Sequence, residues 1–408
     1  MNTSIVLGLG GCLDSEVALD PSRLQALVDD HAVSLTEIRQ PAELRTEHDV
    51  LLSVLDFLRD GVGGERYVST VDAVLAFESH FEHETTLGGT NVRAGRILAQ
   101  LGHPNVLHVP GRDETFESLL VDGSTLPQQT PPAEYVPHLI VQYPAGLRVQ
   151  LRDGTLVAAH SNRVILVHDP VSELTPLHDS LPQWLQPGGV LVLSGLNSIR
   201  DEQILNARLR ALRDTLDDAP AGLRVFYEDS DYHVPAFRRR VWSELASRAT
   251  VIGMNEDELA SFTGTPVDVT DAAQIASAVT TVLENIPGGT LVVHSKYWAL
   301  AAGAQAPELE AALESGNLAA GARFLDGDRA QATSLDLVRA QPRSPQGEDI
   351  ARRLPALLGA PVVVVPARTL RAATPTTIGL GDTFLGGLLA GVVDSDAALR
   401  TPSTVEVS

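Results

Sequence analysis

A glycine-rich stretch near the C-terminus, TTIGLGDTFLGGLLAGVV from Thr376 to Val393, places an acidic residue where a helix is expected to begin. The apolar residues from Phe384 onward recur at helical spacing, so we predict a helix after Gly381. The first N–H groups of a helix lack partners and attract anions, and glycine lets a ligand approach the backbone closely. Asp382 stands at this position, where a carboxylate can take a proton from an attacking hydroxyl group. The alternative is that Asp382 only caps the helix.

Two further groups of carboxylate and amide side chains follow predicted strands. In MNEDEL, Asn255 ends a strand and opens a helix, and Glu258 lies on the same helical face. The two residues can hold water or Mg²⁺ near a phosphate, or they can form a capping box and nothing more. Glu228, in VFYEDSD, also follows a strand. It is either a second carboxylate near the metal ion or a solvated loop residue.

Several polar residues elsewhere have weaker signals. LGGTNVRAG, around Gly89, is a glycine turn that enters a helix, and Asp14 lies just past the first strand. Arg163, in SNRVI, can clamp hydroxyl groups or a phosphate, or it can be a surface arginine. His294, in VVHSKYW, can be an ordinary histidine at a strand end. GLGGCLDSE resembles a dinucleotide-binding motif, but its third glycine and the acidic end of a second strand are missing, so we do not expect a nicotinamide site.

The elements that must position these residues alternate between strand and helix from about residue 185 onward. Apolar strands alternating with helices predict a parallel sheet covered on both faces, with ligands at the C-terminal ends of the strands. Gly195, Glu228, Asn255 and His294 all fall at or just after such ends. Between about residues 114 and 169 the chain instead has short strands and turns, which favour antiparallel hairpins.

The composition limits the possible partners. The chain has 408 residues, of which 44% are hydrophobic and 20% are charged, so it can bury a large core and a second, smaller domain. Its net charge of -22 argues against nucleic acid and anionic membranes as partners. The single cysteine, Cys12, excludes an internal disulfide and fits a reducing compartment. We therefore expect a cytoplasmic protein, a monomer or a small homo-oligomer, without a membrane anchor.

The order of these motifs resembles that of the ADP-dependent glucokinase and phosphofructokinase family, a branch of the ribokinase superfamily. The stretches that carry the resemblance span residues 85 to 393, and they are LGGTNVRAGRILAQLG, HLIVQY, SNRVI, LVLSGLN, VFYED, GMNEDEL, LVVHSKYW and TTIGLGDTF. SGLN and VVHS favour the ADP-dependent branch over the ATP-dependent one. The resemblance implies a ribokinase-like, doubly wound, mostly parallel α/β sheet with a smaller β-rich lid. The large domain would comprise residues 1–15, 87–113 and 169–408, and the lid residues 16–86 and 114–168.

The resemblance also implies roles for the candidate residues, which would together transfer a phosphoryl group from ADP, with Mg²⁺, to a sugar-like acceptor. Asp382 would be the catalytic base, and Gly379 and Gly381 would help to form an anion hole. Glu228 and Glu258 would arrange the Mg²⁺ and its waters with Asn255. The nucleotide side would comprise Asn255, His294, Gly379 and Gly381. The sugar side would comprise Asp14, Gly89, Asn91, Asn162 and Arg163.

The chain departs from the family pattern mainly on the sugar side. Phe226 stands where the family has a histidine, two residues before Glu228, and Thr90 separates the Gly-Gly pair from its asparagine. Gln142 replaces an acid and Cys12 an asparagine. We therefore expect phosphoryl transfer to an acceptor other than plain glucose. Two alternatives remain open, namely an ATP-dependent sugar or nucleoside kinase and a sugar-binding regulatory protein that has lost turnover.

Overall fold

The large sheet of the protein has nine strands and is mostly parallel. The computed structural model describes residues 4–372 and 376–400. Only the pairs β14–β15 and β15–β16 of this sheet are antiparallel. The architecture confirms the predicted α/β class with a mostly parallel sheet. In spatial order the strands are β16 (Val362–Pro366), β15 (Trp298–Gly303), β14 (Thr290–His294), β13 (Val251–Asn255), β12 (Arg224–Glu228), β11 (Val190–Leu193), β1 (Ile5–Gly8), β5 (Asn105–His108) and β6 (Ser124–Thr125).

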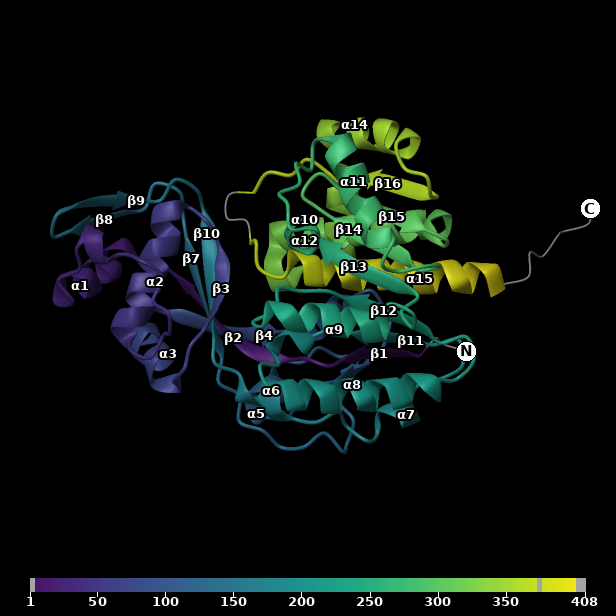
Figure 1. Ribbon diagram of the computed structural model, residues 1–408, viewed down its shortest axis with the longest axis horizontal. Coiled ribbons are helices and arrows are strands. Elements are labelled where there is room, and N and C mark those ends of the chain that lie inside the picture. Colours follow the sequence, from purple (N-terminus) through teal and green to yellow (C-terminus); the bar gives the residue numbers. More distant parts are fainter. Residues whose placement is uncertain (1–3, 373–375, 401–408) are drawn as a thin grey trace, which may run out of the picture.

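Helices cover both faces of the large sheet, because its strands are apolar on both sides (Figure 1). One face packs on α8 (Glu202–Asp217), α9 (Pro235–Leu245) and α11 (Ala272–Leu283), and the other packs on α4 (Thr90–Gln100), α12 (Glu310–Asp326) and α15 (Leu380–Arg400). The remaining helices of this part are α5 (Glu114–Ser118), α6 (Pro170–Leu174), α7 (Leu181–Trp184), α10 (Glu256–Thr263), α13 (Ala332–Arg339) and α14 (Pro345–Arg353).

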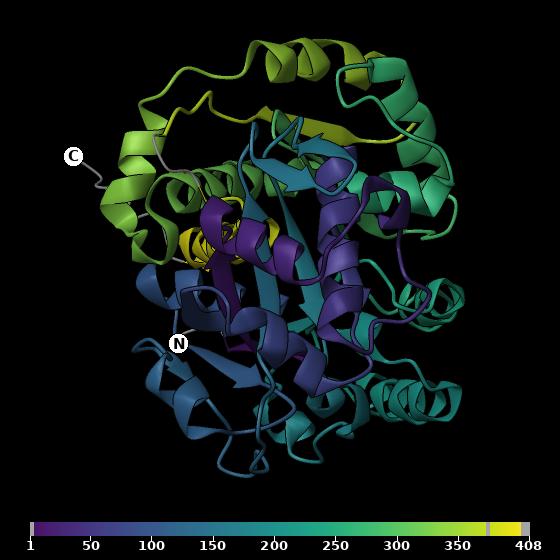
Figure 2. The ribbon, with the colours of Figure 1, turned by 90° about the vertical axis from the view of Figure 1, so that its left-hand side faces the viewer.

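A second sheet of five strands lies beside the large one, on the left in Figure 1 and toward the viewer in Figure 2. It packs on the helices α1 (Pro21–Asp30), α2 (Glu47–Asp60) and α3 (Val71–Glu78) around a separate apolar core. A hairpin of β8 (Arg148–Leu151) and β9 (Gly154–Val157) contributes to the same core. The strands in spatial order are β3 (Gly64–Tyr67), β10 (Asn162–Val167), β7 (His138–Tyr143), β2 (Cys12–Ala18) and β4 (His83–Gly88).

The two faces of the small sheet differ in polarity. In β7, Leu139 and Val141 point into the core with α2, so His138 and Gln142 point to the opposite side. That side faces the large domain: the carboxylate of Glu65 lies 3.3 Å from the imidazole of His233, and the guanidinium of Arg200 lies 3.5 Å from the ring centre of Tyr67. The polar face of the small sheet and the large sheet therefore enclose the region where the candidate residues lie.

The sheets do not follow the predicted segment limits at two places. Strand β6 lies in the segment predicted for the lid, yet it is the edge strand of the large sheet, paired to β5. Strand β2 begins at Cys12 and belongs to the small sheet from its first residue. The assignment of the small sheet as a lid stays a prediction. No helix in the described part of the chain has the length and apolar character needed to cross a membrane.

Candidate functional site

The glycine-rich turn leads into helix α15 as its sequence predicts. Gly379 has a φ of 65°, a left-handed conformation that suits glycine. Its carbonyl oxygen accepts hydrogen bonds from the backbone N–H of Thr383 at 3.0 Å and from the Thr383 hydroxyl at 2.8 Å. Asp382 lies in the first turn of the helix, and its side chain is 24% exposed. The carboxylate thus stands at a helix N-terminus that a ligand can reach.

Two buried arginines flank this turn. A Cβ atom on Gly379 would lie 2.6 Å from Cδ of Arg93 and 3.1 Å from Nε of Arg323, so only glycine fits. Nε of Arg93 lies 3.9 Å from the Asp382 carboxylate. Nη1 of Arg93 is buried and has no hydrogen-bond partner among the described residues. The helix N-terminus, the two guanidinium groups and this unpaired donor together form a site that favours an anion.

The polar strand ends of the large sheet meet beside the same turn. His294, at the end of β14, lies opposite Asn255, at the end of β13. Its Nε2 atom is 3.6 Å from Oε1 of Glu228 on β12. Its ring also lies against the turn, because a Cβ atom on Gly381 would be 3.0 Å from its Cε1 atom. Burial lowers the pKa of His294, which leaves its imidazole neutral.

Glu228 and Glu258 form a pair of neighbouring carboxyl groups at this edge. Burial raises the pKa of both carboxyl groups well above the usual value, and the negative charges of nearby carboxylates raise it further. By contrast, the neighbouring Asp229 is paired, since Nε of Arg238 donates to it at 2.7 Å. Two carboxyl groups that form no ion pair with an arginine or lysine among the described residues, one of them close to Asp382, are oxygen ligands of the kind that Mg²⁺ prefers. The residues at this edge therefore fit a magnesium ion.

Asn255 forms a complete helix cap. Its side-chain oxygen accepts from the backbone N–H groups of Asp257 at 2.8 Å and Glu258 at 2.9 Å. In return, the Glu258 carboxylate accepts from the backbone N–H of Asn255 at 2.7 Å. The capping alternative for this pair is thus present in the structure. The cap also fixes the Glu258 carboxylate at the strand edge.

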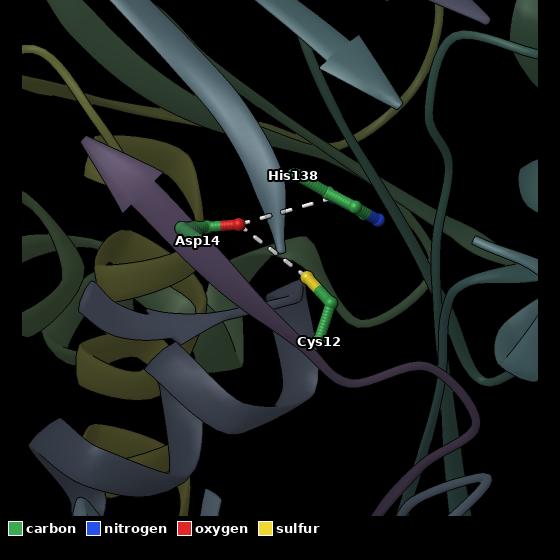
Figure 3. Close-up of side chains that lie close together, drawn as sticks. All are labelled: Cys12, Asp14 and His138. Atoms are coloured by element: carbon green, nitrogen blue, oxygen red, sulfur yellow. Dashed lines mark hydrogen bonds and ion pairs between the residues drawn. The ribbon is translucent and has the colours of Figure 1, made fainter. Parts of the chain in front are cut away.

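On the small-sheet side, Asp14 is held between a guanidinium and two other side chains. Nη2 of Arg93 donates to Oδ2 of Asp14 at 2.6 Å, while Oδ1 faces the thiol of Cys12 and the imidazole of His138 (Figure 3). Burial opposes the charge on Arg93, yet Asp14 and Asp382 raise the pKa of its guanidinium. Burial raises the pKa of the Cys12 thiol to about 12. Burial lowers the pKa of His138, but Cys12 and Asp169 raise it by more, so the pKa lies well above the usual range.

The other predicted sugar-side residues are placed differently from one another. Arg163 alternates with the core residue Val164 and so lies on the polar face of the small sheet, next to Gln142. Asn162 points to the other face, where its side chain lies against Gly63. Asn91 is fully buried and donates to the Leu7 carbonyl at 3.4 Å, within the large domain. Gly89, with a φ of 92°, lets the chain pass close to Gly11.

Sequence reasoning missed Arg93, Arg323 and His138 as site residues. Arg93 lies between Val92 and Ala94 on the buried side of its helix, and a charged residue flanked by apolar ones is the signal that could have identified it. Arg323 lies at the buried end of α12, and its Nε donates to the Ile378 carbonyl at 2.6 Å. His138 opens the strand HLIVQY on the polar face. Only the arrangement of the two sheets side by side shows that these three residues lie at the candidate site.

Comparisons with known proteins identify the family and the fold of the chain. The conserved region of the ADP-specific phosphofructokinase/glucokinase family matches residues 3–389. A hypothetical ADP-dependent phosphofructokinase from Pyrococcus horikoshii OT3 has a TM-score of 0.76 at 18% identity, over 97% of this chain and 99% of its own. An ADP-dependent kinase in complex with fructose-6-phosphate and ADPβS has a TM-score of 0.76 at 16% identity, over 96% and 93% of the two chains.

A more distant structure is the adenosine kinase from Sinorhizobium meliloti, with a TM-score of 0.51 at 11% identity, over 97% of this chain and 88% of its own. The comparison with curated proteins gives no significant match. At identities this low, the likeness to these solved structures establishes a shared fold.

The raised pKa of Glu228 generates a prediction about stability. The folded state holds this proton more tightly than the unfolded state, so the free energy of unfolding falls as the pH rises above the ordinary glutamate pKa of 4.5. Glu228→Gln stays neutral, and we expect it to stabilise the chain relative to wild type more strongly at about pH 8 than at about pH 5.5. Urea denaturation in the presence of a chelator measures the effect. The exposed Glu134→Gln is the control, and a gain from Glu228→Gln that is equal at both pH values would contradict the prediction.

Proposed function

This chain belongs to the ADP-specific phosphofructokinase/glucokinase family and is a sugar kinase, and from that premise we propose how its residues act. The proposed reaction moves a phosphoryl group from ADP to a hydroxyl group of a sugar or sugar-like acceptor and releases AMP. One observation carries the proposal: the Asp382 carboxylate stands at the N-terminus of α15, 3.9 Å from the buried Arg93 guanidinium. A base and an anion site adjoin there, as phosphoryl transfer requires.

In the proposed step, the acceptor oxygen attacks the terminal phosphorus of ADP while Asp382 takes the hydroxyl proton. The new O–P bond forms as the bond from phosphorus to the bridging oxygen breaks, and that oxygen leaves with AMP. The backbone N–H groups that follow Gly379 and Gly381 face the negative charge on the transferring phosphoryl group. The unpaired Nη1 of Arg93 offers a further donor to it.

Glu228 and Glu258 would hold Mg²⁺, since the two carboxyl groups interact with each other and Glu228 also with Asp382, and neither forms an ion pair with an arginine or lysine among the described residues. When bound, the ion would neutralise charge on the donor phosphates. His294 and Asn255 support the nucleotide side from the neighbouring strand ends. Phe226, where the family has a histidine, packs in the core, and the imidazole beside Glu228 comes from His294 instead.

The acceptor would bind between the large sheet and the polar face of the small sheet, which carries Asp14. Arg163 and Gln142 lie opposite each other on neighbouring strands of that face. Cys12, at the start of β2, adjoins Asp14. Two groups that differ from the family pattern, Cys12 and Gln142, are therefore near the proposed acceptor site, and together with the change at Thr90 they favour a polyol, sugar phosphate or nucleoside over plain glucose.

The catalytic base is tested by Asp382→Asn. Loss of a general base lowers the rate by roughly 10²–10⁴-fold, while nucleotide binding should change little because Asn keeps the size of the side chain. Steady-state kinetics and calorimetric titration with ADP measure the two effects. Asp394→Asn, on an exposed position of the same helix, is the matched control. Near wild-type turnover by Asp382→Asn would remove this residue from the role of base.

The donor is tested with purified protein, Mg²⁺ and an acceptor selected by thermal shift from a panel of sugars. Ligands that bind the native state raise its melting temperature by mass action. We expect ADP to support phosphorylation and AMP to accumulate in equal amount with the phosphorylated product, as measured by ion-exchange chromatography. Phosphorylation with ATP and none with ADP would instead support the ATP-dependent alternative. Specific sugar binding without transfer from either nucleotide would support the regulatory alternative.

The acceptor preference is tested by kinetics on the same panel. Each unpaired polar group at a buried contact costs about 1–3 kcal/mol, so two mismatches would make glucose roughly 10²–10⁴-fold poorer than the preferred acceptor. Arg163→Ala should raise the KM for that acceptor, whereas Arg152→Ala, an exposed arginine on the β8–β9 hairpin, should not. Efficient glucose phosphorylation by wild type would overturn the altered preference, and an unchanged KM in Arg163→Ala would place that arginine outside the acceptor site.

A further inference from the structure

We propose that Cys12, Asp14 and His138 form a binding site for a zinc-class divalent metal ion, separate from the magnesium site at the large-sheet edge. The three residues form the only group of three or more metal-ligating side chains of suitable spacing within the described part of the chain. Figure 3 shows the thiol and the imidazole converging on the Asp14 carboxylate. The class of metal follows from the ligands, because thiolate and imidazole select Zn²⁺, Co²⁺ or Cd²⁺ over Mg²⁺.

The strand register creates this convergence. Asp14 on β2 is the direct neighbour of His138 on β7. Cys12 precedes Asp14 by two residues on the same strand, so it projects from the same face of the sheet. Two ligands thus come from one strand and the third from the strand beside it, which fixes their separation through backbone hydrogen bonds.

The distances between ligand atoms are close to those of tetrahedral zinc coordination, since all three ligand atoms lie within 4.8 Å of one another. Oδ1 of Asp14 lies 3.5 Å from Sγ of Cys12 and 3.9 Å from Nδ1 of His138. With metal bonds of about 2.3 Å to sulfur and about 2.0 Å to nitrogen or oxygen, tetrahedral angles separate the ligand atoms by roughly 3.3–3.5 Å. The Cys12–Asp14 separation already fits this range, and binding would draw the His138 ring closer to Asp14.

Outer contacts already orient two of the ligands. The other ring nitrogen of His138, Nε2, lies 3.2 Å from Oδ2 of Asp169, whose Oδ1 accepts from the backbone N–H of Ser172 at 2.9 Å. The other oxygen of Asp14 is held by Arg93 at 2.6 Å. A carboxylate behind the metal-binding imidazole is a common arrangement at zinc sites, where it sets the ring orientation and the tautomer. Nδ1 and Oδ1 are left facing the proposed ion.

The burial of the three ligands also suits a tightly bound ion that has one coordination position free. Cys12 and Asp14 are each 4% exposed, while the side chain of His138 is 18% exposed. Binding would release the thiol proton, and any second proton on the His138 ring, to solvent as the metal–sulfur and metal–nitrogen bonds form. Three protein ligands leave the fourth coordination position to a water molecule.

The ion would compete with the acceptor. This consequence rests on the proposed function, since that function assigns Asp14 to the acceptor, whereas metal binding itself does not depend on it. An ion on Oδ1 of Asp14 removes that oxygen from hydrogen bonding with a hydroxyl group. We therefore expect Zn²⁺ to raise the KM for the acceptor, and chelation to reverse the effect.

Absorption titration of the chelator-treated full chain with Co²⁺ tests the site. Wild type should bind one equivalent with a sulfur-to-cobalt charge-transfer band, and because Cys12 is the only cysteine of the chain the band reports on this site alone. Cys12→Ser and Cys12→Ala should both lose the band. Asp169→Asn, which alters only the outer contact, should weaken binding by roughly 10–100-fold. His83→Asn, an exposed histidine on β4, should leave the titration unchanged.

Absence of the charge-transfer band in folded wild type would overturn the metal site, as would a Cys12→Ala variant that binds Co²⁺ with the wild-type spectrum and affinity. Thermal unfolding shows whether each variant is folded, and Zn²⁺ should raise the melting temperature of wild type but not of Cys12→Ala. A chain that shows the band but transfers no phosphoryl group would refute the proposed function and support the metal site. A chain that binds the metal and keeps its acceptor KM would refute only the competition.

Discussion

The arrangement of the candidate site depends on the charge of one buried side chain, Arg93. Its guanidinium lies within 4 Å of Asp14 and Glu16 on the small sheet and of Asp382 on helix α15. An ionised group can be buried only with partners of opposite charge, and removing one partner of such a pair costs about 3–5 kcal/mol. The charge on Arg93 therefore joins three elements that are far apart in the sequence. It also lies against Gly379, which sets the approach of α15.

A second constraint is the direction of the strands in the large sheet. Strands β12, β13 and β14 run parallel, so their C-terminal ends and the loops that follow lie at one edge. Glu228, Asn255 and His294 are consequently neighbours although 66 residues separate the first from the last. The small sheet covers this edge with its polar face, while its apolar face has its own core with α1, α2 and α3. The site lies where two separate cores leave polar groups facing each other.

The same geometry places two different kinds of ligand set a short way apart. Carboxyl oxygens from the large sheet suit a hard ion such as Mg²⁺, whereas the thiol and imidazole on the small sheet suit a softer one. Arg93 connects Asp14, a member of the small-sheet set, to Asp382 beside the large-sheet set. Any ligand that changes the charge near Arg93 would therefore act on both sides of the site.

Much of the fold could be predicted from local patterns. The sequence identified the helix after Gly381, the strand ends at Glu228, Asn255 and His294, and the strand-rich insert. These features could be predicted because the period of apolar residues and the position of glycines reflect local backbone preferences. Strands β2 and β15 were not identified as strands. In β2, charged and polar residues occupy the face toward the site, and β15 is an all-buried segment, WALAAG, whose alanines carry little strand signal.

The sequence alone therefore determined the class of the fold, the family resemblance and the turn that carries Asp382, since each rests on neighbouring residues. Only the tertiary structure decided which polar residues meet. It brought Arg93 to Asp14 and Asp382, set Cys12 and His138 side by side through strand register, and turned Asn162 to the face of the small sheet opposite Asp14. The reason is physical: an ion pair or a ligand set depends on distances of a few ångströms across elements, and those distances follow from packing between sheets and helices.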